Sequence, residues 1–117
     1  MTAEFVKQFA LQWVAAWNAH NIPEIMEHYA SELAFHSPII KQMGFNEKGL
    51  ITDKKDLQEY FSKALQKYPD LRFDLHEVCV GTNSLVLYYS SINNKKAAEV
   101  MEFDEDGKVC NVFAHYN

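Results

Sequence analysis

The spacing of apolar residues changes once along the chain, and this change limits the possible folds more than any other feature. Up to about residue 68, apolar residues recur every three or four positions, as they do on one face of an α-helix. From Leu71 onward they alternate with polar residues, which is typical of strands with one buried face. Helices gathered first and strands gathered last favour an α+β fold, with the helices on one face of a mainly antiparallel sheet.

Three helices are expected in the first part of the chain. The first covers residues 3–20, where large aromatic residues recur at four-residue steps. Asn21, with a proline and a glutamate in the next three positions, is typical of a capping box and predicts a second, short helix over residues 22–30. A third helix begins after Thr52 or Asp53, either of which can serve as its N-cap.

The strands are separated by clear turn signals. Asp-Gly at residues 106–107 between two apolar runs is a strong hairpin signal. Residues 39–52 contain two glycines and no regular period, so a long loop is expected there. Strands are predicted over residues 33–37, 71–80, 85–92, 97–103 and 108–116.

Length and composition exclude several classes of protein. With 117 residues, the chain forms a single domain, residues 1–117. A net charge of −5 does not suit a nucleic-acid partner, and no apolar run is long enough to cross a membrane. Neither a metal-ligand spacing nor a glycine-rich cofactor motif is present, so no metal and no cofactor are expected. Without an export signal, Cys79 and Cys110 are interpreted as reduced core thiols of a cytoplasmic protein.

The register of the last hairpin decides where Glu99 points. A two-residue turn at residues 106–107 sets Met101 opposite Val112 and leaves Glu99 as the one acidic group on an apolar face. A three-residue loop with a bulge shifts the register by one residue and moves Glu99 to the other face. We favour the first register because it separates apolar from polar side chains more cleanly.

A carboxyl on an apolar face has an altered chemistry. Desolvation disfavours its charged form, so its pKa rises and the group can donate a hydrogen bond or shuttle a proton. The alternative is that Glu99 pairs with a lysine or reaches solvent at the edge of the sheet.

Six segments spread along the chain carry a family resemblance: Trp13 to Asn21, Tyr29 to Ala30, Phe35 to Pro38, Leu57 to Phe61, Pro69 to Phe73 and Glu99 to Val109. Their order resembles that of SnoaL-like proteins in the nuclear transport factor 2-like superfamily, which includes ketosteroid isomerase, scytalone dehydratase and polyketide cyclases. The resemblance implies a cone-shaped, cystatin-like fold of three helices packed on a curved mixed or antiparallel sheet. It also implies a homodimer formed through the outer face of that sheet.

The resemblance to ketosteroid isomerase extends to only part of the catalytic set. The isomerase's general-base Asp falls on Ser37, which cannot take up a proton at neutral pH. Its oxyanion-binding Asp falls on Glu99, a similar group one methylene longer. Its oxyanion-binding Tyr falls near Trp13, and the Tyr that supports it falls on Phe61.

Together these observations predict a cone-fold protein that binds a small apolar, polyketide-like or steroid-like molecule, with Glu99 as the polar anchor or catalytic group. The enzymatic interpretation is a cofactor-independent isomerase, cyclase or dehydratase. The pocket is expected to be lined by Trp13, Trp17, Phe35, Ser37, Tyr60, Met101, Val112 and Tyr116. The alternative is a non-catalytic dimeric association module whose pocket is filled by its own side chains. An open cavity lined by Glu99 favours the first hypothesis, and a solid core favours the second.

Overall fold

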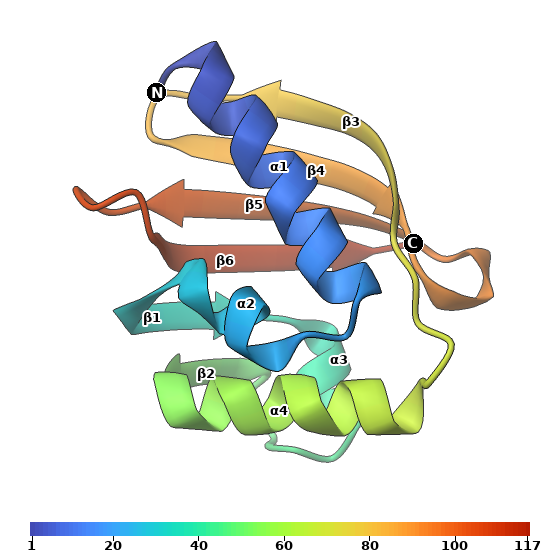
Figure 1. The fold of residues 1–117 in the computed structure, drawn as a ribbon. Helices are drawn as coiled ribbons and strands as arrows, with labels where there is room; N and C mark the ends of the chain where they lie inside the picture. Colours follow the sequence, from blue (N-terminus) through green and yellow to red (C-terminus); the bar gives the residue numbers. More distant parts are fainter.

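A computed structural model describes all residues, 1–117. Four helices, one short 3₁₀ turn and six strands follow one another along the chain (Figure 1). In order they are α1 (Ala3–Asn18), α2 (Ile22–Glu27), β1 (Tyr29–His36), α3 (Pro38–Gln42), β2 (Leu50–Asp53), α4 (Lys54–Lys67), β3 (Asp74–Val80), β4 (Ser84–Ser90), η1 (Ile92–Asn94), β5 (Lys96–Phe103) and β6 (Val109–Tyr116).

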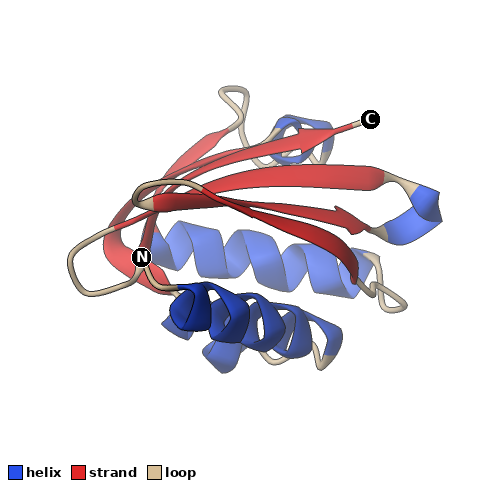
Figure 2. Ribbon diagram, turned by 90° about the horizontal axis from the view of Figure 1, so that it is seen from above, coloured by secondary structure: helices blue, strands red, loops and turns tan.

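The six strands form one mixed sheet in the order β2-β1-β6-β5-β4-β3. The β1 and β6 strands run parallel to each other, and every other neighbouring pair is antiparallel. Seen from above, the sheet curves over α1 and α4, which lie against its concave side (Figure 2). The architecture is therefore the α+β, cystatin-like arrangement expected from the sequence.

The core lies between the helices and the concave face of the sheet. A single cluster of 27 buried residues joins both layers, with Trp13 from α1, Leu57 from α4 and Leu87 from β4 all fully buried. Many of its members are aromatic and meet edge to face, as Trp17 and Phe61 do at 4.7 Å between ring centroids. The cavity described below lies among these aromatic residues.

The second helix is shorter than predicted, because it ends at Glu27 and the chain enters β1 at Tyr29. At this point the backbone pairs with β6 in parallel instead of continuing the helix. The Val109 N–H donates to the His28 carbonyl at 2.8 Å, and Tyr29 is paired with Val109. The predicted N-cap is confirmed, since the Asn21 side chain accepts a hydrogen bond from the Glu24 amide.

The prediction of one long loop over residues 39–52 is wrong. Ser37 caps the short helix α3, its hydroxyl accepting from the Ile39 amide, and the proline that follows fits the first helical position. The chain then forms β2, whose Ile51 is paired with Phe35 of β1. Both elements are too short to show a hydrophobic period in the sequence.

The first strand of the meander begins later than predicted, at Asp74 rather than Leu71. The side chain of Asn18, at the end of α1, explains the delay. Its amide oxygen accepts from the Phe73 N–H at 2.7 Å, and its amide nitrogen donates to the Phe73 carbonyl at 3.0 Å. The backbone of Phe73 is therefore bound to α1 and cannot pair with a neighbouring strand.

The last hairpin has the predicted register but not the predicted turn. Asp104 and Lys108 flank a three-residue loop, with Gly107 in the left-handed region at a φ of 74°. A bulge at Cys110 then compensates for the odd residue, so that Met101 is again opposite Val112. Glu99 therefore points to the concave face, as expected.

The convex face of the sheet exposes large side chains, including Tyr88 of β4 and Phe113 of β6, which are 39% and 37% exposed. Cys79 is also exposed, and Cys110 is only partly buried and lies outside the core cluster, so the interpretation of the two cysteines as core thiols is wrong; neither forms a disulfide. Cys79 faces outward because it alternates with the inner-facing positions of β3. No helix has both the length and the apolar character needed to cross a bilayer.

Candidate functional site

A cavity of about 160 Å³ lies between the helices and the concave face of the sheet. Its walls come from α1, β1, α3, α4, β4, β5 and β6, and ten of its twenty lining residues are aromatic. Its rim is formed by α3, the end of α4 and the turn around η1, which gather at the right-hand end of the molecule in Figure 1. The cavity is therefore an apolar hollow at one end of the cone.

The polar groups of the cavity are not evenly distributed. Gln42, Asn93 and Lys95 are exposed and belong to the rim, and Ser91 beside them is half-buried. Glu99 is the one charged residue of the interior wall, with 4% of its surface exposed. A ligand that enters the cavity therefore passes a polar rim and then contacts aromatic walls, on which Glu99 is the single carboxyl group.

Strand pairing fixes the position of Glu99. Glu99 lies opposite Leu87 of β4 and Ala114 of β6, so both neighbouring strands hold its backbone and direct its side chain inward. The Tyr89 hydroxyl, two residues along β4 from Leu87, donates a hydrogen bond to Oε1 of Glu99. Its second oxygen, Oε2, is buried and has no partner.

This environment brings the titration of Glu99 close to neutral pH. Burial raises the pKa of the carboxyl from 4.5 to about 7, although the hydrogen bond from Tyr89 lowers it in part. Both the acid and the carboxylate are therefore present near neutral pH, which suits a group that moves protons.

Tyrosine hydroxyls surround the carboxyl and keep their own protons. Burial raises the pKa values of Tyr60, Tyr89 and Tyr116, and the negative charge of Glu99 raises them further. Ser37 interacts with the Tyr60 and Tyr116 hydroxyls and lowers the pKa of each in part. At neutral pH all three tyrosines are hydrogen-bond donors beside Glu99.

The two tryptophans of α1 differ in their hydrogen bonding. Trp13 Nε1 donates to the Tyr29 hydroxyl at 3.2 Å. Trp17 lies near the same hydroxyl and contributes to lowering the Tyr29 pKa, while burial raises that pKa more strongly. Nevertheless Trp17 Nε1 is buried and makes no hydrogen bond, so two cavity-lining residues, Trp17 and Glu99, each carry a polar atom without a partner.

Six of the predicted site residues line the cavity and three do not. Those that line it are Trp13, Trp17, Phe35, Tyr60, Glu99 and Tyr116. Met101 and Val112 instead lie opposite each other within the packed core, where neither is accessible. Ser37 is buried behind the wall, because its hydroxyl caps α3. Strand alternation or the family resemblance predicted these three as pocket residues. Neither shows whether an inward-facing residue reaches the cavity or lies in the packed core.

The most important residue that the sequence analysis missed is Tyr89. Residues 85–89 are apolar or aromatic at every position, so alternation cannot show whether Tyr88 or Tyr89 faces inward. The pairing of Leu87 with Glu99 supplies the missing information, because it sets Tyr89 on the same face as the carboxyl. Ile39 of α3 and Met43, the residue that follows this helix, were missed because a loop was expected there.

The donor set of the cavity does not resemble a metal site. It contains one carboxylate and neither histidine nor cysteine, and no group of three or more potential ligands gathers anywhere in the structure. The arrangement can instead bind a small molecule and exchange a proton with it.

The model of the SnoaL-like domain family matches residues 10–112, most of the chain. The chain belongs to the SnoaL-like family. A SnoaL-like protein of unknown function from Burkholderia thailandensis E264 is 33% identical; its crystal structure gives a TM-score of 0.93, and the match covers 100% of this chain and 98% of that one. No functionally curated protein matches this SnoaL-like sequence.

More distant crystal structures share the fold of this SnoaL-like protein. A candidate isomerase of the SnoaL-like family from Agrobacterium tumefaciens C58 is 16% identical, with a TM-score of 0.77 and coverage of 97% and 98% of the two chains. A candidate ketosteroid isomerase from Kribbella flavida is 17% identical, with a TM-score of 0.71 and coverage of 97% and 78%. At these identities the likeness concerns the fold alone.

Proposed function

We propose that this SnoaL-like protein binds a small, mostly apolar molecule in its cavity and that Glu99 exchanges a proton with it. The corresponding reactions are the cofactor-independent isomerisations, cyclisations and dehydrations that need one acid–base group in a water-poor site. The observation that carries the proposal is the Oε2 atom of Glu99, a buried carboxyl oxygen without a hydrogen-bond partner on a residue that lines the cavity.

The surroundings of Glu99 suit this chemistry. As a carboxylate, Glu99 can remove a proton from the carbon next to a carbonyl group, and the C–H electron pair then forms an enolate. Tyr60 and Tyr116 are protonated donors that can stabilise the negative oxygen of such an intermediate. If the proton on Glu99 is replaced by one from solvent before it is delivered to the same carbon, the result is exchange; delivery of a proton to a conjugated carbon gives isomerisation.

As a neutral acid, Glu99 can instead donate a hydrogen bond to the ligand. The two roles have opposite pH dependence, because the base requires the ionised form and the donor requires the protonated form. With a pKa of about 7, activity that rises through neutral pH indicates the base, and activity that falls indicates the donor.

The open cavity supports ligand binding over the alternative of an association module with a filled pocket. In a filled pocket the aromatic residues would pack against one another and Glu99 would face protein atoms on all sides. Here the aromatic residues surround about 160 Å³ of free space, and Glu99, which lines that space, has one carboxyl oxygen without a hydrogen-bond partner.

Proton exchange into a simple ketone tests the proposal without knowledge of the natural substrate. Cyclohexanone is incubated with the protein in D₂O, and loss of its α-hydrogen signals is followed by NMR. The wild type should accelerate exchange above the buffer rate, and Glu99→Gln should abolish the acceleration. Glu102→Gln is the matched control, since Glu102 lies exposed on the outer face of the same strand. Equal rates for wild type and Glu99→Gln would show that Glu99 is not the group that moves the proton.

A further inference from the structure

Two residues that line the same cavity each carry a buried polar atom without a hydrogen-bond partner. Trp17 Nε1 can only donate a hydrogen bond, whereas Oε2 of Glu99 can accept one or, when protonated, donate one. Trp17 and Glu99 are 5% and 4% exposed, so solvent outside the cavity does not satisfy them. Buried polar groups normally have partners, and two exceptions in one hollow indicate the polar groups of its ligand.

The free donor of Trp17 restricts the ligand to molecules that carry an acceptor. Ammonium and amidinium groups have donors only, so a cation of this kind could meet Glu99 but would leave Trp17 unpaired. A carbonyl oxygen accepts from an indole N–H in the ordinary way, and a neighbouring N–H or O–H of the same ligand can donate to Glu99.

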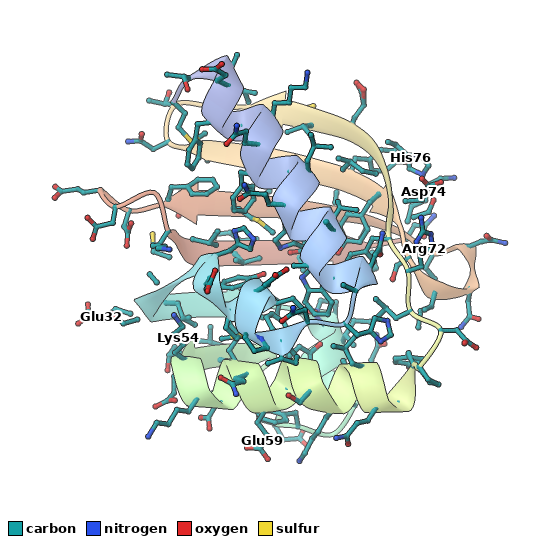
Figure 3. The ribbon with its side chains drawn as sticks, in the orientation of Figure 1. Glu32, Lys54, Glu59, Arg72, Asp74 and His76 are labelled. Atoms are coloured by element: carbon teal, nitrogen blue, oxygen red, sulfur yellow. The ribbon has the colours of Figure 1, made fainter.

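The charges around the cavity disfavour an anion. No lysine, arginine or histidine lines the interior wall, so an anionic ligand would stand beside Glu99 without a counter-ion. Lys95 belongs to the exposed rim, where its Nζ donates to the Asn117 carbonyl at 3.4 Å. Arg72, the one arginine of the chain, is exposed and does not line the cavity; Figure 3 shows it in the same region as Asp74 and His76.

The size of the cavity sets a third limit. An apolar cavity of roughly 150 Å³ is large enough to hold one benzene molecule. The cavity here, at about 160 Å³, therefore suits one ring with a small substituent. Steroids and polycyclic polyketides, which belong to the ligand classes expected from the family resemblance, have several fused rings and exceed this space.

We propose that the ligand is an uncharged molecule of one ring, whose carbonyl oxygen accepts from Trp17 Nε1 and whose adjacent N–H or O–H meets Oε2 of Glu99. This inference rests on the proposed function, because it defines the class of ligand for the same cavity. Size, charge and the two free polar atoms each restrict the ligand independently.

Three nearly isosteric probes test the charge and hydrogen-bonding pattern on the unaltered protein at pH 8. Benzamide is neutral and carries both a carbonyl and an N–H, benzoate is anionic, and benzamidine is cationic. Binding is followed by intrinsic tryptophan fluorescence, because both tryptophans of the chain line the cavity. Benzamide should bind with a Kd at least tenfold lower than that of benzoate or benzamidine. Trp17→Phe should raise the Kd of benzamide at least fivefold. The Kd of toluene, which has no polar group, should change less than twofold.

Other outcomes overturn the inference and leave the proposed function standing. Tighter binding of benzamidine or benzoate than of benzamide would refute the charge assignment. Tighter binding of 1-naphthamide than of benzamide would refute the one-ring limit. If none of the single-ring probes binds, the ligand class is wrong; if Glu99→Gln also leaves cyclohexanone exchange unchanged, the proposed function fails with it.

Discussion

Replacing Glu99 by glutamine should make the protein more stable at high pH than the wild type. In the unfolded chain the carboxyl has its ordinary pKa of 4.5, whereas in the folded protein burial raises the pKa to about 7. Between these values the folded state keeps a proton that the unfolded state releases, so wild-type stability falls as pH rises. One pKa unit corresponds to about 1.4 kcal/mol, so the difference between the two pKa values corresponds to a loss of roughly 3 kcal/mol in the free energy of unfolding. Glutamine has the same shape and never ionises, so the variant avoids this loss.

The difference should be measured by urea unfolding, followed by tryptophan fluorescence, at several values between pH 4.5 and 8.5. At pH 4.5 to 5 the two proteins should be about equally stable, because Glu99 is protonated and resembles glutamine. By pH 8.5 the variant should be more stable by as much as ~3 kcal/mol, less whatever the Tyr89 hydrogen bond loses with an amide acceptor. Equal protein concentrations are needed in case the chain associates.

Glu102→Gln again serves as the control, because it removes a carboxylate from the exposed side of the same strand. A difference between wild type and Glu99→Gln that stays constant from pH 5 to 8.5 would refute the reasoning. It would mean that the carboxyl is not desolvated in the folded protein, and the acid–base role proposed for it would lose its basis.

Three further predictions concern the fold and assembly. Asn18→Ala removes both hydrogen bonds to Phe73 and should lower the free energy of unfolding by about 1–3 kcal/mol in a denaturant titration. Asp53→Ala removes the N-cap of α4, which accepts from two amides, and should lower the melting temperature through a loss of about 1 kcal/mol. We expect the convex face to form a dimer, so light scattering should give twice the chain mass of 13.6 kDa. The double change Tyr88→Lys with Phe113→Lys should give the monomer. A monomeric wild type would contradict the predicted dimer.

The parts of the fold that were predictable are those in which local pattern and tertiary packing agree. The aromatic stripe of α1 and the N-cap Asn21 were correct, and of the two candidate caps for α4, Thr52 and Asp53, the structure has Asp53; capping is predictable because it depends on neighbouring residues alone. The end of α2 was not predictable, since Tyr29 pairs with a strand that lies more than seventy residues away in the sequence. The same applies to Phe73, whose backbone is bound by the side chain of Asn18.

The site divides in a similar way. The inward direction of Glu99 followed from the hairpin register, which a clean separation of apolar and polar faces determines. Depth was not predictable: Met101 shares the face of Glu99 but lies in packed core, because the cavity occupies only one end of the cone. The free N–H of Trp17 depends on angles within a cluster of rings, and no sequence pattern encodes such angles.

The loop at Glu105–Gly107 and the bulge at Cys110 together make the strand register at the cavity independent of the turn at the tip of the last hairpin. The pairing of Met101 with Val112 can be reached either through a tight two-residue turn or through the observed loop plus bulge. The tip can therefore change its length or chemistry while the strands beneath it keep their alignment. A fluorescent label or a short peptide inserted at Glu105 would thus report on the protein without turning Glu99 away from the cavity.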